Sequence, residues 1–221
     1  MKHLLSLILC AMLMLGVVSG AMAYEAGDIV TFGHYDQDND PSNGKEPIEW
    51  VVVDTDEEQG LLFLMSLKCL DAHYYNQKFI AMTWARCDLR RWLNNEFLNE
   101  AFTPEEQEQI AVTHVINEGH HGNPGGDDTD DQIYLLSYRE VLDYYPTMAE
   151  RVAYPTETCI ADGCYVDSKT GACWWWIRSP GTRAIDACGV RVDGRVSGYG
   201  SRDVYRPSGA LRPVMWAAIE E

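Results

Sequence analysis

The stretch Cys173-Trp-Trp-Trp-Ile-Arg-Ser-Pro-Gly181 decides how this chain is expected to fold. Residues 174–178 form a run of aromatic and β-branched side chains that ends at a proline and a glycine, which is typical of a strand followed by a turn. Side chains of a strand point alternately to its two faces, so we expect one side of the tryptophan trio in the core and the other at a surface. Shorter runs of the same kind, separated by glycine turns, follow at 189–192, 195–197 and 211–216.

Upstream of this stretch, strand-like runs alternate with helical patterns. Apolar and β-branched runs predict strands at 28–35, 48–54, 60–66 and 133–136. A helix is expected after Thr83, where Leu89, Trp92, Leu93 and Phe97 recur at helical spacing. Capping boxes at Thr103/Glu106 and Ser137/Glu140 predict two more short helices. Because strands occur on both sides of the polar loop at 117–131, residues 24–221 are predicted to form a single α+β domain.

The charge of the chain excludes some classes of function. The 221 residues carry 34 acidic and 17 basic side chains, a net charge of −17, and 46% are hydrophobic, which is enough for a core. A basic face is needed to bind nucleic acid through counterion release, and this acidic chain would repel phosphate. Binding to nucleic acid and adsorption to anionic lipid are therefore not expected.

Residues 1–23 have the pattern of a secretory signal peptide. A basic start at Lys2 precedes an apolar run over 4–18 and the sequence Ser19-Gly-Ala-Met-Ala23, whose small residues favour cleavage after Ala23. An uncleaved anchor is the alternative, but the apolar run is short for a membrane span. We expect a secreted or cell-surface protein with no membrane span after signal cleavage.

Export changes what the cysteines imply. Six remain after residue 23, and an even number outside the cytosol suggests disulfides, although six cysteines allow fifteen pairings. The preferred pairs close the shortest loops: Cys159–Cys164, Cys173–Cys188 and Cys69–Cys87. Zinc is the competing interpretation, but the chain has no CxxC pair.

Acidic loops are the candidate metal sites. The loop at 122–131 places Asp127, Asp128, Asp130 and Asp131 after flexible glycines, which makes it a weak calcium candidate or simply an open acidic loop. The segment Asp36-Gln-Asp-Asn-Asp-Pro-Ser-Asn-Gly44 has Pro41 at the sixth position of a calcium-binding EF-hand loop, where glycine is needed, and Pro47 follows at the twelfth, where glutamate is needed. We therefore interpret it as a hairpin loop. No cofactor is therefore expected, with calcium as the possible exception.

Aromatic and arginine side chains point to recognition. Glycine-rich loops in the last third carry a predicted ligand-binding set of Trp174, Tyr199, Arg202, Tyr205 and Arg206. A structural role in the core or the fold is predicted for Trp50, Trp92, Trp176, Trp216, Arg178 and Arg212. The nucleophile elbow, the phosphate-binding loop and the dinucleotide fingerprint are missing from the sequence, so no catalytic residue is assigned.

Seven ordered motifs resemble a bacterial family known as domain of unknown function 6273, which is common in exported proteins. They are Phe32-Gly-His-Tyr35, Gly44-Lys-Glu-Pro-Ile-Glu-Trp50, Thr83-Trp84, Leu89-Arg-Arg-Trp-Leu-Asn-Asn95, Tyr134-Leu-Leu-Ser137, Trp175-Trp-Ile-Arg-Ser-Pro-Gly181 and Leu211-Arg-Pro-Val214. The C-terminal pattern is also similar, more distantly, to C-type-lectin-like domains of the sulfatase-modifying-factor type. That second resemblance implies a twisted, mostly antiparallel sheet with two to three short helices and a loop-rich ligand face. It does not imply oxidase activity, because the active cysteines of that enzyme have no counterparts at 159–188.

Two functional hypotheses remain. The preferred one is an exported, non-enzymatic recognition domain whose C-terminal loops contact a glycan or an extracellular protein. The alternative is a secreted enzyme, either a hydrolase or an oxidase of the sulfatase-modifying type. A purely structural module is a third possibility.

Overall fold

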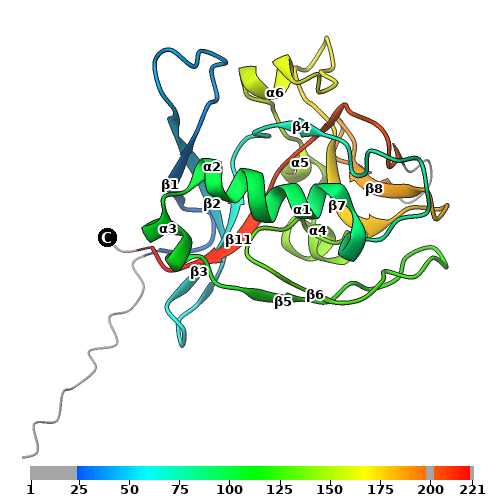
Figure 1. Cartoon of the computed structure of the whole chain (residues 1–221), viewed down its shortest axis with the longest axis horizontal. Coiled ribbons are helices and arrows are strands. Elements are labelled where there is room, and N and C mark those ends of the chain that lie inside the picture. The colour runs from blue at the N-terminus through cyan, green and yellow to red at the C-terminus, as the bar shows by residue number, and fades with distance from the viewer. Residues whose placement is uncertain (1–23, 198–201, 220–221) are drawn as a thin grey trace, which may run out of the picture.

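The first sheet combines the apolar runs of the N-terminal half with the last strand of the domain. The computed structural model describes residues 24–197 and 202–219, so the predicted signal peptide at 1–23 and Tyr199 lie outside the described residues. The strand order is β1 (Ile29–Tyr35), β2 (Glu46–Asp56), β3 (Leu61–Ser66) and β11 (Val214–Ala217), with antiparallel neighbours throughout. Figure 1 shows β1 and β2 as a blue hairpin, with the red β11 nearer the centre.

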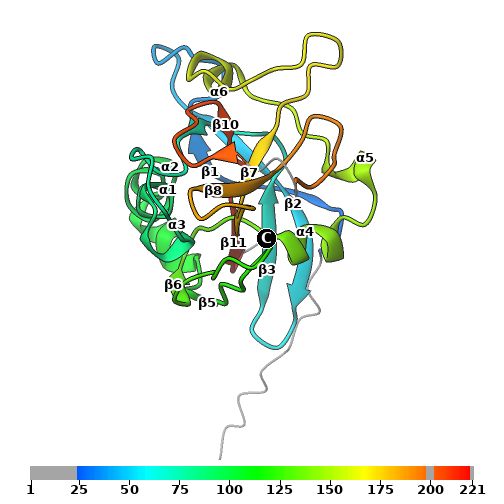
Figure 2. The ribbon, with the colours of Figure 1, turned by 90° about the vertical axis from the view of Figure 1, so that its right-hand side faces the viewer.

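The second sheet is built around the tryptophan-rich strand. Its strand order is β4 (Ala72–His73), β10 (Gly209–Ala210), β7 (Trp175–Pro180), β8 (Asp186–Val190) and β9 (Arg202–Asp203). Only the contact of β10 with β7 is parallel among these pairs. Figure 2 shows β7, β8 and β10 above β11 and the lower part of β3, with β1 of the first sheet at the height of β7.

All three tryptophans of the trio are buried, so the predicted surface side of this strand is wrong. Trp174 is 2% exposed, and Trp175 and Trp176 are fully buried. The indole of Trp175 donates to the carbonyl of Arg151 at 3.1 Å, and that of Trp176 donates to the carbonyl of His73 at 2.9 Å. Both faces of β7 are therefore covered by segments distant in sequence, whereas the expected alternation assumed one open face.

One long helix packs across the sheets, as the helical spacing predicted. It runs from α1 (Asp88–Trp92) through a π-helical turn, η2 (Leu93–Phe97), into α2 (Leu98–Ala101). Its buried residues, Leu89, Leu93 and Phe97, face the core, and the Phe97 ring lies 5.2 Å from that of Tyr35 on β1.

Two predicted capping boxes are confirmed. Thr103 caps α3 (Pro104–Gln109) and Ser137 caps α4 (Tyr138–Tyr144), each with a reciprocal bond from its glutamate. A third box, at Thr147, begins α5 (Met148–Arg151) and has the same sequence pattern, although it was not predicted. The remaining elements are η1 (Trp84–Arg86), β5 (Thr113–Val115), β6 (Thr129–Asp131) and α6 (Glu157–Ala161).

Two predicted strands are not strands. Residues 133–136 and 195–197 each make one isolated bridge, Tyr134 with Val214 and Val196 with Val190. The apolar residues at 133–136 are buried, because this segment crosses the core beside β11 without a continuous ladder. The result is an α+β domain with antiparallel sheets and few helices, in agreement with the predicted class. In the described part of the chain, the helices are too short or too polar to span a bilayer.

Candidate functional site

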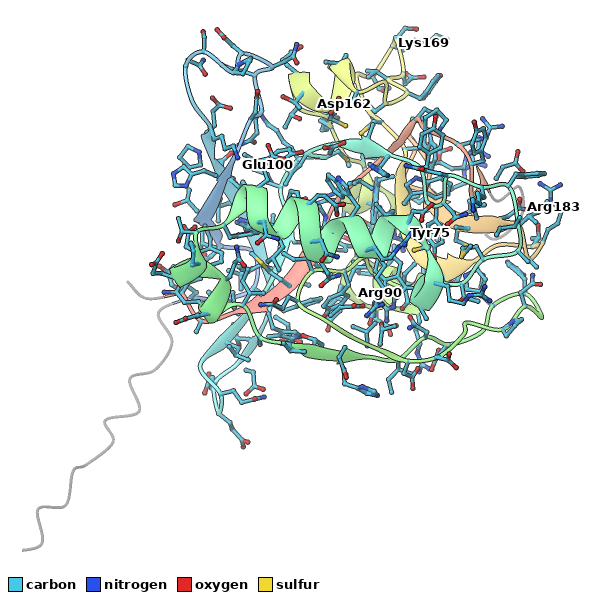
Figure 3. All side chains as sticks on the ribbon, in the orientation of Figure 1. Tyr75, Arg90, Glu100, Asp162, Lys169 and Arg183 are labelled. Atoms are coloured by element: carbon cyan, nitrogen blue, oxygen red, sulfur yellow. The ribbon has the colours of Figure 1, made fainter. Side chains whose placement is uncertain are left out.

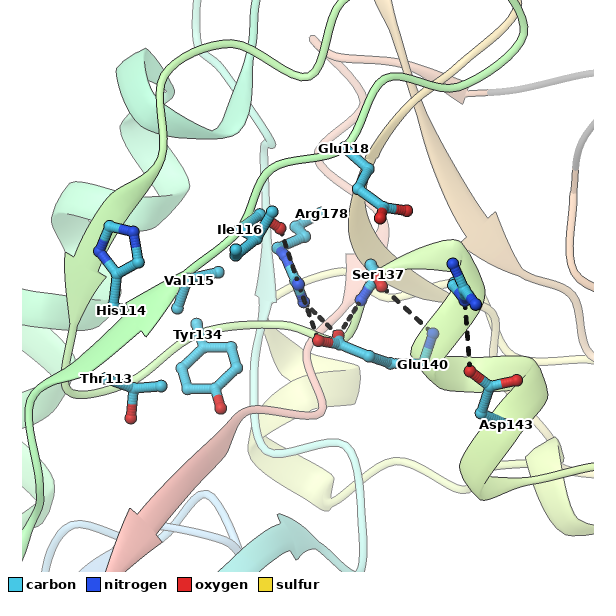
Figure 4. A pocket seen from close by; sticks show the side chains of 11 residues that line it. Thr113, His114, Val115, Ile116, Glu118, Tyr134, Ser137, Glu140, Asp143 and Arg178 are labelled. Carbon is cyan, nitrogen blue, oxygen red and sulfur yellow. Dashed lines mark hydrogen bonds and ion pairs between the residues drawn. The ribbon is translucent and has the colours of Figure 1, made fainter.

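Arg178 and Glu140 lie at the centre of a pocket of about 220 Å³ (Figure 4). Arg178, on β7, donates to both carboxylate oxygens of Glu140 and to the carbonyls of Leu135 (2.8 Å) and Ile116 (3.2 Å). Glu140 is the capping-box glutamate of α4, and it also accepts the backbone N–H of Ser137 at 2.7 Å. The pair therefore joins β7, the segment after β5 and the start of α4.

The charges in this pocket are already balanced. Burial works against the ionised form of Glu140, but hydrogen bonding and attraction from Arg178 outweigh it and lower the pKa of Glu140. At the rim, Arg139 lies 3.7 Å from Asp143 on the same helix. With both oxygens of Glu140 engaged, the carboxylate is not positioned to act as a general base. Arg178 therefore links three segments of the fold, and its structural role stays a prediction.

Arg212 occupies a comparable buried position. Its Nε donates to the carbonyl of Ser66 at 3.1 Å, and its guanidinium lies 5.4 Å from the ring centre of Trp175. Of the predicted structural tryptophans, Trp50 and Trp176 are fully buried, whereas Trp92 and Trp216 are half-buried.

Three aspartates of the predicted calcium loop, Asp128, Asp130 and Asp131, have partners within the protein, and Asp128 and Asp130 share His114. Asp131 is buried and accepts from Arg90 at 2.5 Å and from the Trp84 indole at 2.9 Å. Asp130 contacts His114 at 2.8 Å, which raises the pKa of His114, and Asp128 accepts the backbone N–H of Asn117. In the described ranges, three carboxylates lie close enough together for one cation only at Asp36, Asp38 and Glu46, in the loop interpreted as a hairpin.

The six cysteines are all buried and are free thiols in the structure. The sulfur of Cys173 lies 3.3 Å from that of Cys69, so the structure does not bring together the predicted pairs Cys69–Cys87 and Cys173–Cys188. Short-loop pairing was the wrong criterion here, because residues 104 positions apart meet where the sheets join. The thiols of Cys159 and Cys164 are in contact, as the third predicted pair requires.

A hollow of about 340 Å³ lies on the C-terminal face. We call it the aromatic–arginine hollow and define it by Tyr165, Trp174, Arg191, Val192, Arg206 and Ser208. Backbone hydrogen bonds connect the segments that line it. The Tyr165 N–H donates to the carbonyl of Ser208 (3.3 Å), and the Ala210 N–H donates to the carbonyl of Trp174 (3.2 Å). Tyr165 is 52% exposed, whereas Trp174 is buried.

The guanidinium groups of this hollow are weakly neutralised. Arg191 reaches Asp193 only at 4.0 Å, and that aspartate is shared with Arg195 at 3.0 Å. Across residues 24–197 and 202–219, the structure gives Arg206 no ion pair, and its side chain is exposed. By contrast, Arg183, at the right edge in Figure 3, contacts both Asp186 (2.7 Å) and Asp203 (2.5 Å).

The predicted ligand-binding set is only partly brought together. Trp174 and Arg206 line the hollow, whereas the Tyr205 ring lies 5.1 Å from that of Tyr74, outside the hollow lining. Arg202 is the first residue of β9, and Tyr199 is not described. Tyr165, Arg191, Val192 and Ser208 were missed. Arg191 could have been found from the sequence, because residues 178–212 contain seven arginines and only three aspartates, a local excess of positive charge.

Comparison with protein families finds one match. The model of the family described as Domain of unknown function (DUF6273) matches residues 59–219. The chain belongs to this family. The DUF6273 match covers the aromatic–arginine hollow, the Arg178–Glu140 pair and all six buried cysteines, and it begins after β2. Neither the curated proteins nor the solved structures that were compared give a match.

Proposed function

We propose that this chain is an exported, non-enzymatic recognition domain that binds an acidic glycan in the aromatic–arginine hollow. The observation that carries the proposal is the placement of Arg191 and Arg206 beside the exposed ring of Tyr165. The local charge supports it, because residues 178–212 carry four more basic than acidic side chains, whereas the whole chain carries a net −17.

Each lining group suits one part of such a ligand. A guanidinium donates two parallel hydrogen bonds to a carboxylate or sulfate, and Arg206 is free to turn toward one. The face of Tyr165 offers apolar area for a sugar ring, and Ser208 adds a hydroxyl. The volume of about 340 Å³ falls in the range of small-ligand pockets.

We also infer that the domain has a C-type-lectin-like fold. A C-type-lectin-like arrangement is supported by β11, which pairs with β3 in the sheet that also contains β1. It is further supported by the second sheet, whose short strands are linked by the loops around the hollow. In this proposal the loop-rich end of the molecule is the ligand face.

The proposal is tested by titrating purified protein with acidic and neutral oligosaccharides of equal length in a calorimeter, with and without EDTA. We expect binding to the acidic series only, unchanged by EDTA. Arg206→Ala should weaken binding about tenfold, since a hydrogen bond to a charged group is worth about 1.5–3 kcal/mol. Arg139→Ala is the matched control, because Arg139 is equally exposed but lies on α4, outside the hollow.

Other outcomes would contradict this function. Equal binding to neutral sugars, or equal loss in the Arg139 variant, would show that the hollow is not an acidic-glycan site. Binding to an extracellular protein without glycan binding would replace the ligand class. Turnover of an ester, peptide or glycoside panel would favour the secreted enzyme instead.

A further inference from the structure

Four cysteines from distant parts of the chain form one buried cluster. Cys69 follows β3, Cys159 lies in α6, Cys164 follows α6, and Cys173 precedes β7. The sulfur of Cys173 lies 3.3 Å from that of Cys69, and Cys164 interacts with the thiols of both Cys159 and Cys173, so the four follow one another in a row. We call this row the four-cysteine cluster.

The backbone fixes the inner pair of this row. Cys69 N–H donates to the carbonyl of Tyr154 at 2.9 Å, and Cys173 N–H donates to that of Ala153 at 2.9 Å. The consecutive residues Ala153 and Tyr154 thus hold both cysteines, which explains why the sulfurs of two residues 104 positions apart meet. Since contact of the two sulfurs is the requirement for a disulfide, the geometry favours the Cys69–Cys173 bond.

A structural zinc ion does not fit this arrangement. A tetrahedral site needs four sulfurs about 2.3 Å from one ion, so that every sulfur lies close to every other. Within the part of the chain that the structure describes, no three of these sulfurs lie within 4.8 Å of one another. The cluster is a row and not a cage, and a row of thiols is suited to exchange between neighbours.

Cys164 differs from the other three members. It is 8% exposed, while Cys69, Cys159 and Cys173 are fully buried. Hydrogen bonds from the thiols of Cys159 and Cys173 lower the pKa of Cys164, whereas the same contacts and burial raise the pKa of Cys159 and Cys173. Cys164 is therefore the most exposed member of the cluster and the one whose pKa is lowered, two properties that favour attack on an external disulfide.

We propose that the four-cysteine cluster is a thiol–disulfide relay in which Cys164 takes up oxidising equivalents from a low-molecular-weight disulfide and transfers them to Cys69–Cys173. The Cys164 thiolate attacks the external disulfide, forms a mixed disulfide and releases one thiol. Cys173 then attacks the Cys164 sulfur as its proton passes to the departing thiolate, which releases the second thiol and leaves a Cys164–Cys173 bond. Cys69 attacks Cys173, forms the Cys69–Cys173 disulfide and returns Cys164 as a thiolate.

The three exchange steps balance in electrons and protons. Two protein thiols lose two electrons and two protons, and one external disulfide becomes two thiols. A second molecule of the external disulfide oxidises Cys164 and Cys159 by the same chemistry and leaves a Cys159–Cys164 bond. The final state has two disulfides, one of which connects the start of the tryptophan strand to the end of β3.

Cys87 and Cys188 lie outside the relay. The Cys87 sulfur accepts the Arg90 N–H as the cap of α1, and the Cys188 thiol donates to the carbonyl of Pro180 at 3.2 Å. Burial raises the pKa of both thiols to about 12, and among the described residues the structure gives neither of them a contact with the four-cysteine cluster. They should remain alkylatable after denaturation.

The relay is tested on folded, fully reduced protein exposed to oxidised glutathione, with timed acid quenching, alkylation and peptide mapping. We expect a Cys69–Cys173 peptide with two glutathione thiols released per bond. Cys164→Ser should slow this bond at least about tenfold, because the buried pair loses its accessible attacking thiol. Cys188→Ser is the matched control: Cys188 is also a buried cysteine but lies outside the cluster, and a serine hydroxyl can keep its bond to the Pro180 carbonyl, so Cys69–Cys173 should form at the wild-type rate.

A second measurement covers the case in which a variant does not fold. Wild-type folded protein treated with less than one equivalent of N-ethylmaleimide should be labelled at Cys164 first, and the yield of Cys69–Cys173 should then fall in proportion to the labelled fraction. Wild-type rates in Cys164→Ser would overturn the relay. So would first labelling at another cysteine, or a map showing Cys69–Cys87 and Cys173–Cys188.

Discussion

At the scale of a single residue, Asp71 is the side chain whose protonation should most affect stability. It is 7% exposed and accepts the Tyr35 hydroxyl at 2.6 Å. Burial raises the pKa of Asp71 to about 6, while the Tyr35 bond opposes the shift. The folded carboxyl therefore holds its proton at a pH where the unfolded one, near 3.8, has lost it.

Asp71→Asn should remove this pH dependence. Because the folded pKa is the higher one, wild-type stability falls as pH rises from about 4 to about 6, by up to about 3 kcal/mol. Asparagine keeps an oxygen for Tyr35 but carries no charge. In urea unfolding, the variant should be more stable than wild type at about pH 7.5 and lose this advantage at about pH 4.

An exposed aspartate provides the comparison for this effect. Asp143→Asn changes the same functional group on the surface of α4, where its side chain is 67% exposed. Its free energy of unfolding should follow that of wild type across the pH range. A difference between wild type and Asp71→Asn that stays constant with pH would show that the carboxyl is not protonated in the folded state at about pH 5.

At the scale of elements, the capping box of α4 serves two functions, whereas that of α3 serves one. Glu140 closes the cap and neutralises Arg178, whose side chain is 5% exposed. Glu106 closes the cap of α3, and the structure pairs it with Thr103. Removing one partner of a buried ion pair leaves an uncompensated charge, which costs about 3–5 kcal/mol.

Glu140→Gln should therefore destabilise the domain far more than Glu106→Gln. We expect a loss of about 2–4 kcal/mol for Glu140→Gln, since its partly exposed side chain admits some water to Arg178. Glu106→Gln should cost at most about 1 kcal/mol. Chemical denaturation of the two variants measures both, and equal losses would show that the Arg178 pair contributes nothing beyond the cap.

Elements set by local chemistry were predictable from the sequence, while those set by distant partners were not. The capping boxes at Thr103 and Ser137 depend on four consecutive residues, and both formed as predicted. The burial of Trp174 depends on segments far away in the chain, so a rule of alternation cannot find it. The same limit explains Cys69–Cys173: short-loop pairing ignores the sheet junction that brings the two residues together.

The residues of the candidate site were also predictable only where local sequence indicates them. Trp174 and Arg206 were found because the loops around them are rich in arginine and aromatic residues. Tyr165 was not found, since its place beside Ser208 depends on a backbone hydrogen bond across 43 residues (208 less 165). Gly209 lies in β10, where an added Cβ would come within 1.9 Å of the Trp176 indole nitrogen, a close approach that also depends on a residue distant in the chain.

At the scale of the whole molecule, the net charge of −17 opposes compaction. Self-repulsion destabilises a folded chain of high charge, and salt shortens its range from about 30 Å at 0.01 M to about 8 Å at 0.15 M. The midpoint of thermal unfolding at pH 7 should therefore rise with sodium chloride over this interval. A gain of about 1 kcal/mol corresponds to about 2–4 °C for a domain of this size.

The pI near 4.6 supplies the control for this prediction. At that pH the net charge is near zero, so screening has little repulsion to remove and the midpoint should not change with salt. Binding of an acidic ligand at Arg191 and Arg206 should respond in the opposite direction, weakening at pH 7 as salt rises, because that attraction is screened as well. An equal rise in the midpoint at the pI would mean that salt acts through general exclusion from the protein surface and not through charge.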